Sequence, residues 1–181
     1  EYVEAWDLQK CLVRRRHEEA IGDVMLMLEH PHTYTVGRRG SREHILINDS
    51  QLADMNIGVQ FVDRGGEVTY HGPGQLVGYP VIHLQQWGGP LRYVRFLEDV
   101  IIAALRDYGI SGQKIAGNTG VWVGTQKIAA IGLKVSQGIS MHGFALNVSP
   151  DLSYFDHIVP CGMPDSQVTS MEDMLGHSVP V

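Results

Sequence analysis

The chain has 181 residues, of which 44% are apolar, and a formal net charge of −6 at pH 7. This length and composition fit one ordinary globular domain that spans residues 1–181. The negative net charge argues against nucleic acid as a partner, because nucleic-acid binders are usually basic. No apolar run reaches about 18 residues, so no membrane partner is expected. The chain's two cysteines are too few for a disulfide framework, which makes the cytoplasm the expected compartment.

The first half of the chain predicts one helix followed by short strands. The helix is expected over 5–19, and DVMLML at 23–28 predicts a buried strand that ends before His30-Pro31. Further strands, each rich in β-formers and bounded by turn residues, are expected at 33–36, 59–62, 67–71 and 75–84. Pro80 lies inside the last of these, which indicates an edge strand or a bulge.

The second half predicts a long helix over 90–108, with Pro90 at its first position and Gly109 after its end. Apolar residues recur there at spacings of three and four: Leu91, Val94, Leu97, Ile101, Ala104, Leu105 and Tyr108. A hairpin of 120–123 and 127–135, a strand at 141–148 and a short helix at 170–175 follow. This order favours an α+β fold, in which helices flank a mixed, largely antiparallel sheet.

Cys161 lies in Val159-Pro160-Cys161-Gly162, a loop context rather than an apolar strand or helix. A reactive thiol must be reachable and its thiolate must be stabilised, and a loop suits both needs. A lone cysteine is more often a small buried apolar residue, and that interpretation stays open for Cys161. Cys11 lies among apolar positions of the first predicted helix, and we expect it to be such a buried residue.

A nucleophilic thiol needs a neighbouring base or cation, because its free pKa is about 8.5. The residues of suitable type are Lys127, Lys134, His71, His142 and His157. Lys127 opens a run of small apolar residues, IAAIG, and is expected at the rim of a cavity. Strand periodicity places Lys127 and Lys134 on opposite faces unless Gly132 forms a bulge. The alternative, that either lysine is a solvated surface charge, stays open.

The segment 64–75, RGGEVTYHGPGQ, contains four glycines in twelve residues. Glycine lets backbone amides approach a ligand closely, so the segment predicts an anion cradle or the wall of a narrow acyl tunnel. It is not a P-loop, because no Gly-Lys-Ser/Thr follows. A plain glycine-rich hairpin is the alternative.

Two further patterns carry less information. His30 and His32 have no cysteine or carboxylate at a spacing that suits zinc, so no metal site is expected there. Arg38, Arg39 and Arg42 form either a basic patch that meets an acidic partner or a solvated face.

Four blocks of the sequence, taken in order, resemble one known family: LEHPHTYTVGRRG (28–40), DRGGEVTYHGPGQLVGYPVIHL (63–84), KIAAIGLKVSQGISMHGFALNV (127–148) and IVPCGMPDSQVTS (158–170). They resemble the octanoyl-acyl-carrier-protein:protein N-octanoyltransferases, also called lipoyl(octanoyl) transferases. The RGG…TYHGPGQLVGYP and PCG motifs are specific to this family, whereas the first block is shared with related ligases. The resemblance implies the fold of the biotin/lipoate protein ligases, with 1–181 as a single acyltransferase domain.

The resemblance also implies a Cys/Lys pair. The cysteine of PCG, here Cys161, is the family's nucleophile, and the lysine before the IAAIG-like strand is Lys127. Lys134 matches a place where relatives carry arginine and receives no catalytic role. The substrate-binding positions that the resemblance implies are Arg64, Gly65, Gly66, Tyr70, His71, Gly72, Gly74, Gln75, Ile131, Gly132, His142, Gly143 and Ala145.

The reaction that the resemblance implies consists of two acyl transfers. Octanoyl-acyl carrier protein loads Cys161 as a thioester, and a lysine of a lipoyl domain then takes the acyl group as an amide. The acceptors are lipoyl domains of 2-oxoacid dehydrogenases and the glycine cleavage H protein. No ATP and no metal are expected, because conversion of a thioester to an amide is downhill.

Three alternatives remain open. The first is an ATP-dependent lipoate or biotin ligase on the same fold, which makes an acyl-adenylate and needs no cysteine. The second is an acyl-binding or scaffold protein without catalysis. The third is a cysteine hydrolase, which must admit water to the acyl-enzyme.

Overall fold

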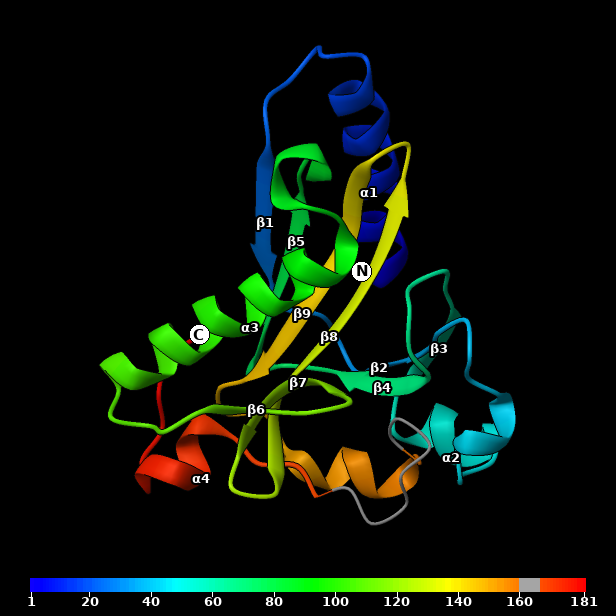
Figure 1. Ribbon diagram of the computed structural model, residues 1–181. Coiled ribbons are helices and arrows are strands. Elements are labelled where there is room, and N and C mark those ends of the chain that lie inside the picture. Colours follow the sequence, from blue (N-terminus) through cyan, green and yellow to red (C-terminus); the bar gives the residue numbers. More distant parts are fainter. Residues whose placement is uncertain (160–166) are drawn as a thin grey trace.

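The computed structural model describes residues 1–159 and 167–181. Its strands are β1 Val24–Leu28, β2 Thr33–Val36, β3 Gly58–Phe61, β4 Val68–His71, β5 Gln75–Val81, β6 Gln113–Ile115, β7 Asn118–Val123, β8 Gln126–Ser136 and β9 Ile139–Asn147. They form a six-stranded sheet in the order β1-β5-β9-β8-β7-β6 and a three-stranded sheet in the order β3-β2-β4 (Figure 1).

Four α-helices accompany the two sheets in the described residues: α1 Tyr2–His17, α2 Asp49–Asp54, α3 Pro90–Asp107 and α4 Met171–Leu175. Short 3-10 helices lie at Arg42–His44, Leu84–Trp87 and Leu152–His157. Helix α1 packs against β9 and β5, and α3 packs against β7 and β8. Helix α2 lies beside the small sheet (Figure 1).

The strand pairings confirm the predicted fold class. The described pairings of the large sheet are antiparallel. In the small sheet β2 pairs with β4 antiparallel and with β3 parallel. The result is a mixed, largely antiparallel α+β fold with flanking helices.

Helix α3 forms because its buried residues follow the helical repeat. Tyr93, Leu97, Ile101 and Leu105 recur at intervals of four and are each at most 4% exposed. Full burial of a large apolar side chain contributes about 1.5–3 kcal/mol. This stripe therefore seats the helix on the large sheet and fixes the position of its first turn, which Pro90 begins.

The β8–β9 hairpin is the longest continuous pairing of the large sheet, from Ala129–Leu146 to Ser136–Ile139. Its turn residues Gln137 and Gly138 both have positive φ, at 52° and 78°. Two consecutive residues with positive φ form a turn whose twist matches that of the two hairpin strands. The predicted hairpin of β7 and β8 is also present.

The structure excludes one of the two alternatives predicted for Pro80. Strand β5 lies between β1 and β9, so it is not an edge strand. Its pairing with β9 stops at Gly78–Phe144 and resumes only at the isolated bridge His83–Ile139. Within the gap, Ser140 Oγ donates to the carbonyl of Pro80 at 2.7 Å. The irregularity accommodates a residue that has no N–H to donate.

Candidate functional site

A cavity of about 710 Å³ lies over β8 and β9, beneath the loop 64–68 and beside the first turn of α3. Ten of the predicted site residues line it: Arg64, Gly65, Gly66, His71, Lys127, Ile131, Gly132, His142, Gly143 and Ala145. Val68, Leu133 and Phe144 add apolar surface, and Arg38 and Arg39 lie at the wall as well. The volume falls within the usual range for small-molecule sites, about 300–1,000 Å³.

The loop 64–66 forms the roof of the cavity where it crosses β8. Gly65 N donates to Leu133 O at 2.9 Å, which fastens the loop to the strand. A Cβ on Gly132 would lie 2.8 Å from Gly65 O, closer than real contacts allow. Gly66 has a φ of 92°, a conformation that glycine adopts without strain. The glycines at 66 and 132 are therefore needed for the crossing itself.

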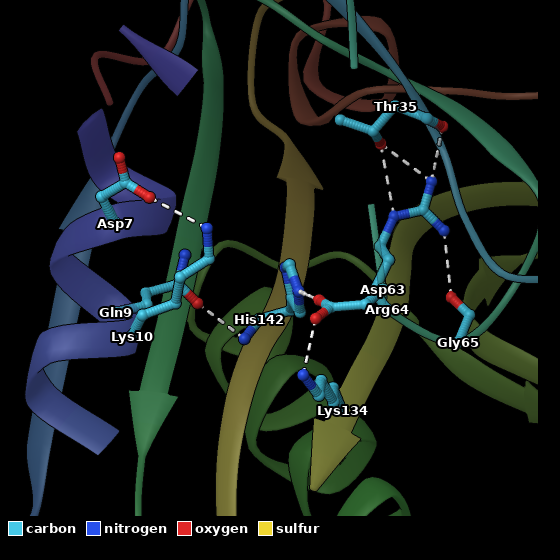
Figure 2. A network of polar contacts seen from close by, with 9 residues as sticks. All are labelled: Asp7, Gln9, Lys10, Thr35, Asp63, Arg64, Gly65, Lys134 and His142. Atoms are coloured by element: carbon cyan, nitrogen blue, oxygen red, sulfur yellow. Dashed lines mark hydrogen bonds and ion pairs between the residues drawn. The ribbon is translucent and has the colours of Figure 1, made fainter. Parts of the chain in front are cut away.

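Arg64 brings a buried positive charge to the cavity wall, with 8% of the residue exposed. Its Nη2 donates to Thr35 O at 2.7 Å, Thr35 Oγ1 at 2.8 Å and Glu67 O at 2.9 Å. Its Nη1 donates to Gly65 O at 3.0 Å (Figure 2). These four contacts fix the position of the guanidinium at the cavity wall.

His71 lies at the end of β4 and lines the cavity from the small sheet. Its Nδ1 is 2.8 Å from Gln75 Oε1, and its Nε2 is 3.3 Å from Thr35 Oγ1. Burial, followed by the nearby His30 and Arg64, lowers its pKa to about 3. The ring is therefore neutral at physiological pH and does not act as a proton carrier there.

Four of the predicted binding residues lie behind the cavity wall rather than in its lining: Tyr70, Gly72, Gly74 and Gln75. Tyr70 bonds to His32 Nδ1 at 2.9 Å and stacks on Tyr154. A side chain on Gly72 would overlap the Tyr70 hydroxyl. Gly74, with a φ of 83°, accepts hydrogen bonds from Val148 and Ser149. These residues shape the turn from β4 into β5.

Lys127 lies at the start of β8 and is only 8% exposed. Its Nζ lies 4.8 Å from the ring centroid of Trp122, a cation–π contact. The register between β7 and β8 shifts here, since Val121 pairs with Ala129 but Trp122 pairs with Lys127. Ile128 is thus the extra residue of a β-bulge, which sets the direction of the lysine. The bulge lies at 128 rather than at Gly132.

Lys134 forms an ion pair with the carboxylate of Asp63. Its Nζ donates to Asp63 Oδ2 at 2.6 Å, and the other carboxylate oxygen accepts from His142 Nε2 at 2.8 Å (Figure 2). Burial works to raise the pKa of Asp63, but the hydrogen bonds from Lys134 and His142 outweigh it and leave that pKa below its usual value. Asp63 therefore stays ionised and anchors the start of the roof loop.

His142 is 1% exposed and has a φ of 57°, unusual for a residue other than glycine. Its backbone N–H donates to Gln9 Oε1 of α1 at 2.7 Å. Burial lowers the pKa of its ring, and the Asp63 carboxylate only partly opposes this effect. The histidine links α1 to the roof loop as a neutral group.

Cys161 lies outside the described residues. The described residues on either side of 160–166 are held by backbone hydrogen bonds. Val159 N donates to His44 O at 2.8 Å. On the far side, Lys127 N donates to Gln167 O at 2.9 Å, and Thr169 N donates to Lys127 O at 3.0 Å. The residues that follow the PCG motif thus pair directly with the backbone of Lys127.

Sequence reasoning missed Asp63, Thr35, Tyr2 and Tyr79. Tyr2 comes from α1, far away in sequence, and lines the cavity together with Tyr79. Burial raises the pKa of Tyr2 to about 12, so its hydroxyl keeps its proton. Only Asp63 had a local signal, because it is a charged residue directly before the glycine-rich segment. Nothing in the sequence near Tyr2 indicates a binding role.

The arginines of the predicted basic patch separate into two groups. Arg38 and Arg39 are exposed residues of the cavity wall. Arg42 instead donates to Ile45 O, Ile47 O and the Asp49 carboxylate within its own loop.

In residues 1–159 and 167–181, no three His, Cys, Asp or Glu side chains are grouped to hold a metal ion. No helix among these residues is long and apolar enough to cross a bilayer.

Solved structures of lipoate protein ligases share the fold of this chain. A solved structure of a putative lipoate protein ligase from T. acidophilum superposes with a TM-score of 0.72 at 15% identity, over 96% of this chain and 74% of that one. At that identity the likeness concerns the fold alone. The model of the lipoyl protein ligase A/B catalytic domain matches residues 1–181, and the chain belongs to this family.

Closer relatives come from curated sequences. A protein named octanoyltransferase from Chloroflexus aurantiacus is 51% identical over 98% of this chain and 81% of its own length. Another octanoyltransferase, from Chloroflexus aggregans, is 50% identical over 100% of this chain and 84% of its own. The predicted family resemblance is confirmed by both.

Proposed function

We propose that this chain is an octanoyltransferase of lipoate biosynthesis that carries the acyl group on Cys161. The observation that carries the proposal is the 51% identity to a curated octanoyltransferase across 98% of the chain. The cavity supports it, because a buried lysine and an apolar wall converge there. We place the reaction in the cytoplasm, where a catalytic thiol remains reduced.

In the first half-reaction, the Cys161 thiolate attacks the thioester carbonyl of octanoyl-acyl carrier protein. The Sγ–C bond forms, the carrier's C–S bond breaks, and the carrier leaves as a thiol. Lys127 takes the proton from the Cys161 thiol and returns it to the leaving sulfur. The bulge at Ile128 and the ring of Trp122 hold the Lys127 side chain for this role.

In the second half-reaction, the amine of a lipoyl-domain lysine attacks the acyl-enzyme. The N–C bond forms, the Sγ–C bond breaks, and Cys161 is regenerated. Lys127 accepts one proton from the incoming ammonium and later releases it to solvent, and the second proton passes to the leaving Cys161 sulfur. The acceptors are lipoyl domains of 2-oxoacid dehydrogenases and the glycine cleavage H protein. An amide is more stable than a thioester, so the cycle consumes no ATP.

The cavity has two kinds of wall that suit a medium acyl chain joined to a thioester. Val68, Ile131, Leu133 and Phe144 offer apolar surface to the chain. Each CH₂ that is fully buried contributes about 0.8 kcal/mol. Arg64 offers a fixed positive charge on the same wall, and such a charge stabilises a developing oxyanion.

The nearest rival is an ATP-dependent ligase with the same fold. One experiment separates the two: the protein is mixed with octanoyl-acyl carrier protein, without acceptor and without ATP, and its intact mass is measured. We expect one octanoyl mass on the peptide that contains Cys161, removable by hydroxylamine and transferable to an added lipoyl domain. An absolute need for ATP, with no mass on Cys161, would move the protein to the ligase class.

A further inference from the structure

A chain of hydrogen bonds runs from the cavity wall to the backbone beside Lys127. Its members are buried polar residues of the roof loop, of both sheets and of the segment after β9. The contacts are Arg64 Nη2 to Thr35 Oγ1 at 2.8 Å, Thr35 Oγ1 to His71 Nε2 at 3.3 Å, His71 Nδ1 to Gln75 Oε1 at 2.8 Å, Gln75 Nε2 to Asn147 Oδ1 at 2.9 Å, and Asn147 Nδ2 to Thr169 O at 3.0 Å.

The two ends of this chain fix the direction of its donors. The carbonyl of Thr169 can only accept, so Asn147 presents its NH₂ there and its oxygen to Gln75. Gln75 Nε2 therefore donates to Asn147, and it also donates to Tyr70 O at 3.1 Å. The remaining oxygen of Gln75 faces His71, which must supply a hydrogen from Nδ1.

The Arg64 end of the chain also requires the His71 tautomer that carries its hydrogen on Nδ1. The guanidinium of Arg64 can only donate, and it directs both Nε and Nη2 at Thr35 Oγ1, at 3.3 and 2.8 Å. Both lone pairs of that hydroxyl are thus occupied, and its single hydrogen points to His71 Nε2. That nitrogen must be an acceptor, so His71 is neutral and carries its proton on Nδ1.

A second proton on His71 has no place in this arrangement. It would direct an N–H at the Thr35 hydroxyl, which already accepts from Arg64, and it would place a second cation beside the guanidinium. The ring also faces Tyr2 at 5.9 Å and His30 at 5.7 Å between centroids. Burial lowers the pKa of His30 to about 4, so that neighbour brings no compensating charge and is itself neutral.

We propose that His71 is a positioning residue, held as the neutral Nδ1–H tautomer, that couples the placement of Arg64 to the backbone of Lys127. The coupling reaches Lys127 because Thr169, the last acceptor of the chain, donates its own N–H to Lys127 O at 3.0 Å. The donors all point from Arg64 toward Thr169, and such aligned bonds strengthen one another. The role rests on the proposed function, in which Arg64 and Lys127 serve the same reacting carbonyl.

The tautomer is tested on the wild-type protein, labelled with ¹⁵N histidine. Long-range ¹H–¹⁵N spectra separate the two neutral tautomers and the charged ring, and His71→Asn assigns the signals by their disappearance. We expect a neutral ring with its hydrogen on Nδ1 from pH 8 down to pH 5. A hydrogen on Nε2, or a charged ring at pH 6, overturns the proposal.

The positioning role is tested with Thr35→Val and its conservative control Thr35→Ser. Thr35→Val removes the hydroxyl that links Arg64 to His71, whereas Thr35→Ser retains it. We expect kcat for octanoyl transfer to fall about tenfold to a hundredfold in Thr35→Val with little change in KM, and to recover largely in Thr35→Ser. Unfolding curves for both variants report whether each is folded.

The outcomes also separate this proposal from the proposed function. An unchanged kcat in folded Thr35→Val, or a loss in Thr35→Ser equal to that in Thr35→Val, rejects the positioning role. Wild-type protein that never acquires an octanoyl group on Cys161 rejects the proposed function instead. The tautomer of His71 is measured without any substrate, so it is decided in either case.

Discussion

Acid should destabilise this protein in a way that depends on His71. The folded pKa of His71 is lowered to about 3, whereas an imidazole in the unfolded chain has a pKa of about 6.5. Between these values the unfolded chain binds a proton that the folded protein does not. Above pH 6.5 His71 therefore leaves the free energy of unfolding unchanged. As the pH falls from 6.5 toward 3, the protonation of His71 in the unfolded chain lowers that free energy.

The size of the effect follows from the two pKa values. Integrating the difference in bound protons from pH 8 to pH 5 gives a loss of about 2 kcal/mol in the free energy of unfolding. His30, whose pKa is lowered to about 4, also lowers the free energy of unfolding between pH 8 and pH 5. The contribution of His71 alone is therefore measured as a difference between wild type and a variant.

The assay is urea unfolding of wild type and His71→Asn at pH 8 and at pH 5. His71→Asn is less stable at both values, because it loses contacts, but its loss between the two should be smaller than that of wild type by about 2 kcal/mol. His17→Asn, which removes an exposed histidine of α1, is the matched control and should retain the wild-type loss. If wild type and His71→Asn lose the same free energy, the folded protein binds a proton at His71 and the argument for a neutral ring fails.

Three further predictions concern the reaction. Cys161→Ala should abolish octanoyl transfer while Cys11→Ala leaves the rate nearly unchanged, and a comparable loss in both would contradict a single nucleophile. Lys127→Ala should lower the single-turnover rate by about 10²–10⁴-fold, and Lys134→Ala should lower it much less. The reason is that Lys127 lines the cavity, whereas Lys134 is held by a carboxylate. A larger loss of rate in Lys134→Ala than in Lys127→Ala would reverse the assignment. Arg39→Glu should weaken the binding of an acyl carrier protein donor more than that of a small acyl thioester. Rising salt should also weaken the binding of the carrier protein to wild type, because exposed charges are screened beyond about 10 Å at 0.1 M salt. Equal effects on both donors would place the arginine at the acyl site instead.

The elements that the sequence predicted well are those with a strong local repeat. The stripe from Leu91 to Tyr108 predicted α3 almost to the residue, since 90–108 was expected and Pro90–Asp107 is found. The strands expected at 127–135 and 141–148 correspond to β8 and β9, and they were predicted from runs of apolar and β-forming residues bounded by turn residues. Helix α2 was missed although Asn48 and Gln51 form a capping box, because six residues carry too little repeat. Pro80 alone could not distinguish an edge strand from an irregularity inside the sheet, because the irregularity depends on Ser140 of a distant strand.

The candidate site was predicted where the chemistry is local. Ten expected residues meet in one cavity because the loop 64–66 and the strands β8 and β9 each contribute several neighbours. The turn residues Gly72 and Gly74 lie behind the wall, where a Cβ would meet the Tyr70 hydroxyl or the backbone of Ser149. Tyr2 was beyond reach, because its place in the lining follows from how α1 packs on the sheet and leaves no pattern in the sequence.

The roof crossing at Gly132 limits which positions of the cavity wall can carry a larger side chain. A larger side chain at Gly132 would strike Gly65 O, and one at Gly143 would strike the carbonyl of Gly78, so both would displace backbone before they filled the cavity. Ala130 and Ala145 also line the cavity but already carry a Cβ. The two glycines are therefore the wrong positions to change if the cavity is to be narrowed without moving the backbone.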